Sequence, residues 1–252
     1  MKTRTTYVVG GVRIPFMKSM TAYRDVTTPE LMTASLKSLV ERYNLKGKVV
    51  GDVALGALMQ SSANWNFARE VVQASGLHPN TPAYNVQRAC GTSLETTIQI
   101  AHKISSYQIE SGIAGGVDSN SDLPIMVTRS FSQKLVALNS ARTLGEKLRI
   151  FLSFRPSDLK PVPPAVVEPR TGKSMGEHCE LMVKEWKISR QEQDELALAS
   201  HLNAAKAYKD GFYADLVFPF LGKSTDGIMR GDTTLEKLAK LKPAFDRSEK
   251  GT

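Results

Sequence analysis

Two patterns of apolar residues alternate along the first half of this chain. Short runs of consecutive apolar residues are typical of buried β-strands. They occur at residues 7–11, 53–58, 84–86 and 111–117. Longer stretches repeat apolar residues every three or four positions, which predicts amphipathic helices. These stretches are residues 29–43, 67–74 and 92–107.

The flanking residues support these helix boundaries. Thr28 precedes the first helical stretch and is the expected N-cap, and Gly76 follows the second as a C-cap signal. Strands that alternate with helices predict an α/β fold, in which a mostly parallel sheet lies between layers of helix. Ligands of such sheets bind at the carboxyl ends of the strands.

The pattern changes after Pro124, where loops become longer. Residues 190–210 predict a long helix, and residues 126–160 combine bulky apolar side chains with many basic ones. From position 129 to 160 there are seven Lys or Arg against Glu146 and Asp158, a net charge of +5. Such a segment can lie on an anionic membrane or dock against a partner helix. A surface helix that packs on its own domain is an equally good interpretation.

Composition narrows the class of protein. The 252 residues are 41% hydrophobic and 23% charged, as in ordinary globular proteins, and no apolar run is long enough to cross a membrane. Two distant cysteines provide no disulfide framework and favour a reducing, cytoplasmic location. The net charge of +8 is compatible with polyanionic ligands but does not choose among them. The four histidines show no zinc-ligand spacing, so we expect no metal site.

Cys90 is the strongest candidate for chemistry. It stands between the predicted strand at 84–86 and the predicted helix at 92–107. Open backbone N–H groups at a helix N-terminus favour the thiolate, which is the nucleophilic form of cysteine. Gly91 and Thr92 are small enough to let a substrate approach the sulfur. A lone cysteine is more often buried and inert, so the surrounding sequence has to decide.

The sequence around Cys90 resembles the thiolase family. Asn85-Val-Gln-Arg-Ala-Cys-Gly-Thr-Ser93 is similar to the segment that carries the acyl-accepting cysteine of 3-ketoacyl-CoA thiolases. Four further segments match family motifs in the same order, and they begin at Arg13, Asn66, Gly115 and Met175. Segments 141–148, 161–165 and 241–246 resemble the long-chain β-oxidation branch, whose members partner a multifunctional α subunit.

The resemblance implies a thiolase-like layered fold of two parts. Residues 1–122 would form the N-terminal thiolase domain without its last edge strand, and residues 123–252 an inserted loop domain that covers the CoA site. The implied strand order is 3-2-1-4 in chain order. Family members continue into a second half that supplies a histidine and a second cysteine, so we expect a fragment, a split-gene product or a deliberately shortened chain.

The resemblance also implies the chemistry. Cys90 would attack a 3-ketoacyl-CoA and hold the shortened acyl group as a thioester. Arg230 would meet a CoA phosphate, Leu241 would pack on the adenine, and Met175 would line the pantetheine channel. CoA and acyl-CoA are then substrates, with no separate cofactor. We expect slow turnover without the second-half groups, since losing one acid–base group costs ~10²–10⁴-fold.

Partners follow in the same way. We expect a homodimer through residues 83–87, no nucleic-acid partner, and contact of residues 126–160 with a membrane or a hydratase/dehydrogenase α subunit. A non-catalytic CoA-binding or partner-binding module of the same fold remains an alternative. A Cys–His hydrolase that uses Cys90 with His178 is a third possibility, and the family resemblance disfavours it.

Overall fold

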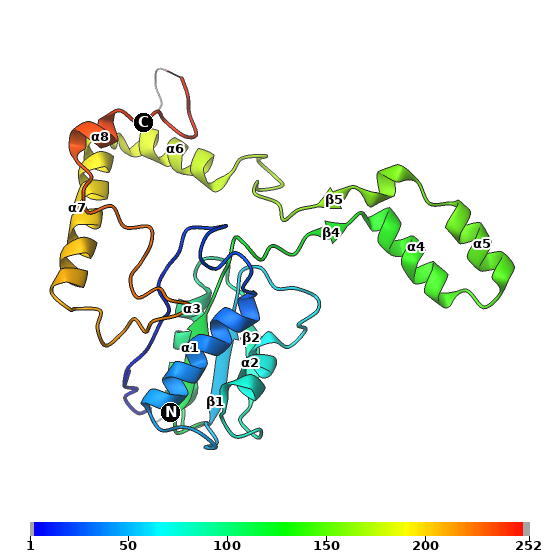
Figure 1. Ribbon diagram of the computed structural model, residues 1–252, viewed down its shortest axis with the longest axis horizontal. Coiled ribbons are helices and arrows are strands. Elements are labelled where there is room, and N and C mark those ends of the chain that lie inside the picture. The colour runs from blue at the N-terminus through cyan, green and yellow to red at the C-terminus, as the bar shows by residue number, and fades with distance from the viewer. Residues whose placement is uncertain (1–2, 249–252) are drawn as a thin grey trace.

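A computed structural model describes residues 3–248, and it has three visibly distinct parts. The first is a small sheet covered by helices α1, α2 and α3. The second is a slender arm that contains α4 and α5. The third is a group of helices, α6, α7 and α8, which lies beside the sheet on the side opposite the arm (Figure 1).

The sheet is parallel and has the order β2-β1-β3. Strand β1 (Asp52–Gly56) lies in the centre, between β2 (Ala83–Val86) and β3 (Gly112–Gly116). In register, Val53 pairs with Ala83 on one side and with Ile113 on the other. Every residue of β1 is buried, which explains the apolar run from Val53 to Leu55. The strands predicted at residues 53–58, 84–86 and 111–117 are confirmed.

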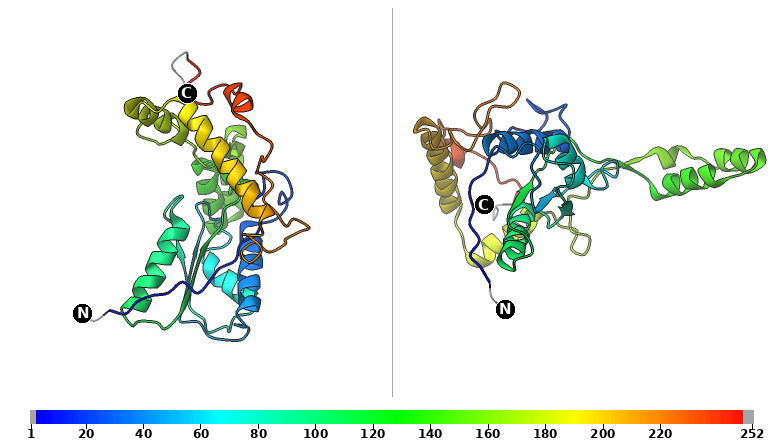
Figure 2. Two further views of the ribbon diagram at one scale, coloured as in Figure 1. Left: turned by 90° about the vertical axis from the view of Figure 1, so that its left-hand side faces the viewer. Right: turned by 90° about the horizontal axis from the view of Figure 1, so that it is seen from below.

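Helices cover both faces of this sheet (Figure 2). Helices α1 (Thr28–Arg42) and α2 (Phe67–Ser75) bury Leu36 and Val71 against Val53 and Leu55 of β1. Helix α3 (Thr92–Ser105) covers the opposite face, where Ile100 packs near Ala54. Side chains alternate across a strand, so one central strand supplies both layers of the core. The predicted helices and the Gly76 C-cap, with φ of 90°, are confirmed.

Three predictions about this region were wrong. Thr27 caps α1 instead of Thr28, because Glu30 then stands at the third helical position and closes a capping box with Thr27. Residues 7–11 form no strand: the chain is extended there, and Tyr7, Val8 and Val9 are highly exposed. The strand order 3-2-1-4 is therefore incorrect, because the predicted second and fourth strands pair directly as β1 and β3.

The arm is a helical hairpin on a short ribbon. Strands β4 (Met126–Val127) and β5 (Pro161–Val162) pair antiparallel and lead into α4 (Arg129–Ser140), α5 (Leu144–Leu152) and the 3₁₀ turn η1 (Pro156–Leu159). Asp158 fixes its base: the carboxylate is 5% exposed and lies 2.6 Å from the Lys134 ammonium. Asp158 Oδ2 also accepts the Arg155 backbone N–H at 2.8 Å.

The third part contains α6 (Met175–Trp186), α7 (Arg190–Lys209) and α8 (Leu235–Ala239). It is held to the N-terminal segment through Arg13, whose guanidinium makes a bidentate ion pair with Asp226 at 2.7 and 2.8 Å. Asp226 also accepts the Phe16 backbone N–H at 2.7 Å. Residue 13 forms a parallel bridge with Val217, so backbone and side chain make the same connection.

Asp158 gives the arm a testable dependence on pH. The hydrogen bond from Lys134, aided by the Arg155 N–H, lowers the pKa of Asp158 to about 2. Its contribution to the stability of the arm is therefore complete above the ordinary aspartate pKa near 4, and it is lost as the pH falls through about 2. We expect Asp158→Asn to accelerate amide hydrogen exchange throughout residues 129–160 at pH 7, with exchange in the sheet unchanged.

Lys147→Gln is the matched control, because it removes a charge from the same arm without touching its base. Equal exchange rates in Asp158→Asn and Lys147→Gln would contradict this account of how the arm is fixed.

Candidate active site

Cys90 lies in a tight turn that joins β2 to α3. The Gly91 N–H donates to the Arg88 carbonyl at 3.0 Å and closes the turn. The Thr92 hydroxyl ties the two sides together, since it donates to the Ala89 carbonyl at 2.7 Å and accepts the Arg88 N–H at 2.9 Å. Cys90 itself is exposed at this junction. The strand-to-helix placement expected from the sequence is therefore correct.

The turn holds a residue in an unfavourable backbone conformation. Ala89 has φ of 45°, in the left-handed region that costs an L-residue about 1–2 kcal/mol. Strain of this kind persists only where surrounding contacts enforce it, and it is concentrated at functional sites. Gly91 follows as the N-cap of α3 and provides no side-chain cap. The positive end of the α3 dipole is thus available to a negative group beside Cys90.

Glycines bring the first turn of α3 close to the strand ends. A Cβ atom on Gly56 would collide with the Val86 carbonyl and with the Thr92 side chain. A Cβ atom on Gly116 would collide with the hydroxyl of Ser93. The carboxyl ends of β1 and β3 therefore support the turn that carries Cys90, at the edge of the sheet where parallel folds bind ligands.

Asp118 is a supporting residue that the sequence did not single out. It follows β3, and its Oδ1 accepts the N–H groups of Leu58 and Met59 at 2.8 and 3.4 Å. Burial raises the pKa of Asp118, and these two hydrogen bonds offset part of that rise. The Leu58 carbonyl in turn accepts Gln87 Nε2 at 3.4 Å, three residues before Cys90. The only signal for Asp118 in the sequence is its place in the motif that begins at Gly115.

The three residues expected to bind CoA lie on the α6–α8 part. Met175 is the first residue of α6 and is 75% exposed. Arg230 lies in the loop between α7 and α8, and its backbone N–H donates to His201 Nδ1 of α7 at 3.3 Å. Leu241 follows α8, and its carbonyl accepts Arg190 Nη2 of α7 at 3.0 Å.

Arg230 and Leu241 both contact helix α7, whereas Cys90 lies in the turn between β2 and α3. Their contact residues on α7, His201 and Arg190, are eleven positions apart, so the two anchor points lie about 16 Å apart along the helix axis. Cys90 lies on the sheet, and the Arg13–Asp226 ion pair helps to connect the two parts.

The second cysteine and its neighbour show a different environment. Cys179 is exposed within α6, away from the start of that helix. His178 Nε2 lies 2.8 Å from the Thr171 hydroxyl in the preceding turn. His178 therefore belongs to the α6 part and Cys90 to the sheet, which gives the Cys–His hydrolase no geometric support. Within residues 3–248, no three His, Cys, Asp or Glu side chains gather into a possible metal site.

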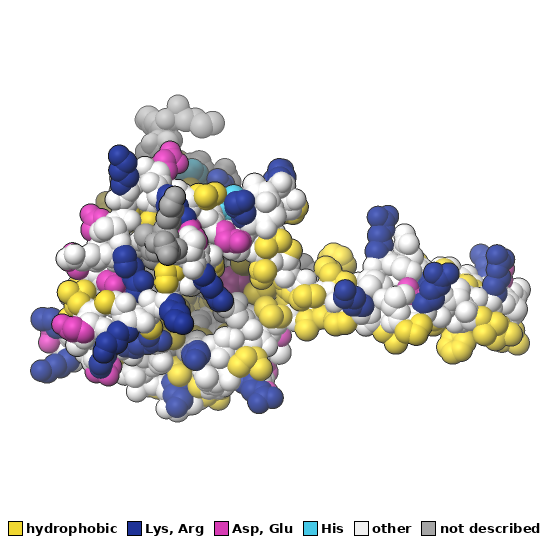
Figure 3. All heavy atoms as spheres, turned by 90° about the horizontal axis from the view of Figure 1, so that it is seen from above, with side chains coloured by type: hydrophobic (Ala, Val, Ile, Leu, Met, Phe, Trp, Pro, Cys, Tyr) yellow, Lys and Arg dark blue, Asp and Glu magenta, His cyan; other side chains and the backbone are white. Residues whose placement is uncertain are grey.

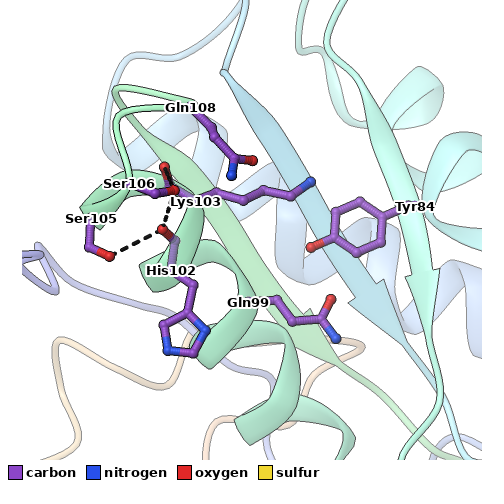
Figure 4. A pocket seen from close by; sticks show the side chains of 7 residues that line it. All are labelled: Tyr84, Gln99, His102, Lys103, Ser105, Ser106 and Gln108. Atoms are coloured by element: carbon purple, nitrogen blue, oxygen red, sulfur yellow. Dashed lines mark hydrogen bonds between the residues drawn. The ribbon is translucent and has the colours of Figure 1, made fainter. Parts of the chain in front are cut away.

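A cavity of about 490 Å³ opens beside the other end of α3 (Figure 4). Tyr84 of β2 lines it together with residues of α3 and the turn that follows, including Gln99, His102 and Lys103. Lys103 lies over the Tyr84 ring, 4.3 Å from its centroid, and pairs with Asp52. Helix α3 is about 20 Å long. Because Cys90 precedes its first turn, this cavity does not serve the thiol.

Comparison with known proteins agrees with the fold. Residues 6–252 match the model of the thiolase N-terminal domain. The 3-ketoacyl-CoA thiolases of Photobacterium profundum and Citrobacter koseri are each 41% identical to the chain over 246 and 249 residues, 95% of this chain. The chain spans only 56% of the length of these relatives.

A solved structure gives the same result in three dimensions. The acetyl-CoA acetyltransferase of Bacillus anthracis superimposes with a TM-score of 0.79 at 28% sequence identity, covering 98% of this chain and 61% of that one. Within residues 3–248, no helix has the length and apolar character needed to cross a membrane. The strand–turn–helix around Cys90, the domain match and the relatives all agree, and the chain belongs to the thiolase family.

Proposed function

We propose that this chain provides the nucleophile and the CoA-binding surface of a cytoplasmic 3-ketoacyl-CoA thiolase of fatty-acid β-oxidation. The observation that carries the proposal is the exposed Cys90 at the start of α3, held there by a strained turn. The names of the relatives support the same reaction class. Residues 1–122 would carry the thiol, and residues 123–252 would cover CoA as the loop domain.

The proposed step forms a thioester on Cys90. The Sγ thiolate attacks the ketone carbon of a 3-ketoacyl-CoA, and the Cα–Cβ bond of the substrate breaks. Acetyl-CoA leaves as its enolate and takes up a proton, while the shortened acyl group stays on sulfur until a CoA thiol removes it. The positive end of α3 and the Cys90 N–H stabilise the negative oxygen of the tetrahedral intermediate.

Acyl transfer to Cys90 can be measured in a single turnover. Incubation with an acyl-CoA is expected to add one acyl group, sensitive to hydroxylamine, to Cys90 and none to Cys179. Cys90→Ser should abolish the adduct, whereas Cys179→Ser should leave its rate within about twofold of the unaltered chain, because helix interiors do not activate a thiol as N-termini do.

Peptide mapping by mass spectrometry reads both sites together. Equal acylation of the two cysteines, or acylation of Cys179 alone, would contradict the proposed role. CoA binding without acylation would favour the non-catalytic CoA-binding module.

The arm supports a second proposal, docking to an anionic membrane surface. Exposed apolar side chains recur along one face of α5 at Leu144, Leu148, Phe151 and Leu152. In Figure 3, apolar side chains follow the lower edge of the arm, while Lys and Arg side chains project from its front and upper side. This separation, with a net charge of +5 over residues 129–160, is the arrangement of an interfacial helix.

Vesicle flotation tests this docking. Binding to vesicles that contain anionic lipid is expected at low salt and should fall as salt rises, because each basic residue contributes about 1 kcal/mol near such a surface. Phe151→Ser should weaken binding about tenfold, since it removes the burial of one large apolar side chain. Phe154 is a poor target, because its side chain is only partly exposed and its ring packs on both Phe131 and Phe151, at 5.4 and 5.8 Å.

Leu202→Ser on α7 is the matched control, since Leu202 is also exposed but lies outside the arm. Binding to a hydratase/dehydrogenase α subunit without binding to vesicles would replace the membrane by that protein partner. Binding to neither would contradict docking through the arm.

We further propose a homodimer through β2, which forms one edge of the sheet. Open backbone groups along an edge strand favour pairing with a second strand. Trp65 lies beside this edge, 86% exposed, and its carbonyl accepts Asn85 Nδ2 of β2 at 3.0 Å. A large aromatic side chain on an anchored backbone is typical of residues that dominate an interface.

Sedimentation equilibrium at micromolar concentration is expected to show a dimer. Trp65→Ala should raise its dissociation constant at least about tenfold, as loss of an interface aromatic does. Trp186→Ala is the control, because Trp186 is 64% exposed on α6. A monomer at all concentrations would exclude pairing through β2.

A further inference from the structure

The segment from Asp226 to Leu241 lies along a single stripe of α7. Four residues of α7 contact this segment: Tyr208, Ala205, His201 and Arg190. Successive members of this set are three, four and eleven residues apart, which places all four on one face of the helix. The Asp226 N–H donates to the Tyr208 hydroxyl at 3.1 Å. At the other end, Arg190 Nη2 donates to the carbonyls of Leu238 and Leu241 at 2.7 and 3.0 Å.

His201 makes the central attachment. Its Nδ1 accepts the backbone N–H of Arg230 at 3.3 Å, and the next residue, Gly231, lies against Ala205. A Cβ atom on Gly231 would stand only 2.9 Å from the Ala205 Cβ, so the loop lies close to the helix at this point. The Arg230 carbonyl accepts the Thr233 N–H at 3.2 Å and completes the attachment of this peptide unit.

This arrangement fixes the backbone of Arg230 and leaves its side chain exposed. A backbone N–H can only donate, so Nδ1 of His201 must carry a lone pair and the ring must be neutral when this bond is made. A guanidinium on a fixed backbone loses less freedom when it binds a phosphate than one on a mobile loop does. The contact of His201 with this loop is made to the backbone of Arg230, not to its guanidinium.

We propose that His201 is a positioning residue, which holds the Arg230 loop on α7 so that the guanidinium meets an anionic phosphate of CoA. The inference rests on the proposed function, in which Arg230 contacts CoA. The proposal adds His201 as the residue that fixes the geometry of this contact. It predicts that a hydrogen-bond acceptor at the position of Nδ1 is what holds the Arg230 loop on α7.

Two amide substitutions separate the ring nitrogens. An Asn side chain places its oxygen near the Nδ1 position, whereas a Gln side chain reaches the Nε2 position. In amide hydrogen exchange without ligand, His201→Ala and His201→Gln should accelerate exchange in residues 226–233, and His201→Asn should restore it to within about twofold. Unchanged exchange in His201→Ala, or equal rescue by Gln and Asn, would overturn the positioning role.

Titration with CoA then tests the consequence for the ligand. Loss of one hydrogen bond corresponds to about fivefold in affinity, so we expect this increase in Kd for His201→Ala and His201→Gln, with His201→Asn near the unaltered chain. Arg230→Ala is the reference for complete loss of the phosphate contact. If Arg230→Ala weakens CoA binding and His201→Ala does not, the inference is wrong and the CoA assignment stands.

The reverse outcome is equally distinct. If Arg230→Ala leaves the affinity for CoA unchanged, or if the unaltered chain does not bind CoA, the CoA assignment of Arg230 fails and with it the ligand part of the inference. Hydrogen exchange still decides by itself whether His201 holds the loop.

Discussion

The arrangement of this molecule depends on the ion pair between Arg13 and Asp226. These two residues are 213 positions apart, and the pair joins the start of the chain to the segment that follows α7. Burial opposes the ionisation of Asp226, but hydrogen bonds from Arg13, the Phe16 N–H and Tyr208 outweigh it and lower the pKa of Asp226. Removing one partner of a fully buried pair leaves an uncompensated charge, which costs roughly 3–5 kcal/mol. The Arg13 and Asp226 side chains are 21% and 14% exposed, so water compensates part of that charge and we expect a smaller cost here.

Aromatic side chains pack against the Arg13 side of this ion pair. The Arg13 guanidinium lies over the Phe16 ring, 4.4 Å from its centroid, and within 5.4 Å of the Tyr213 centroid. Tyr23, which follows Arg13 in the N-terminal segment, packs edge-on against Phe220, which precedes Asp226. These contacts set the position of α7 relative to the sheet. They therefore also set the relation between the surface that carries Arg230 and the turn that carries Cys90.

Local patterns in the sequence were sufficient to predict the elements around Cys90. The helix at α2 has a capping asparagine, an apolar face and a terminal glycine, and each of these acts within a few residues. The segment 7–11 has the same apolar character as a strand but has no strand beside it to complete its hydrogen bonds. Apolar pattern reports which side chains seek burial, and it does not identify the neighbour that pairs with the backbone.

The same limit applied to the site. Cys90 could be found because strand, small residues and helix adjoin in the sequence. The left-handed conformation of Ala89 could not, since alanine has no preference for it. Asp118, Asp226 and His201 were missed because each acts on a backbone group that is distant in sequence. Apart from the place of Asp118 in the motif that begins at Gly115, no residue type or spacing marks such contacts before the chain is folded.

The ribbon at the base of the arm has a mechanical consequence. Only two residues from each strand, in β4 and β5, join the arm to the rest of the molecule, whereas α4 alone is about 18 Å long. The arm is therefore a lever: a rotation of about 10° at the ribbon displaces its tip by about 3 Å. A small change in the geometry of this ribbon is therefore magnified at the far end of the arm, where α4 and α5 are joined.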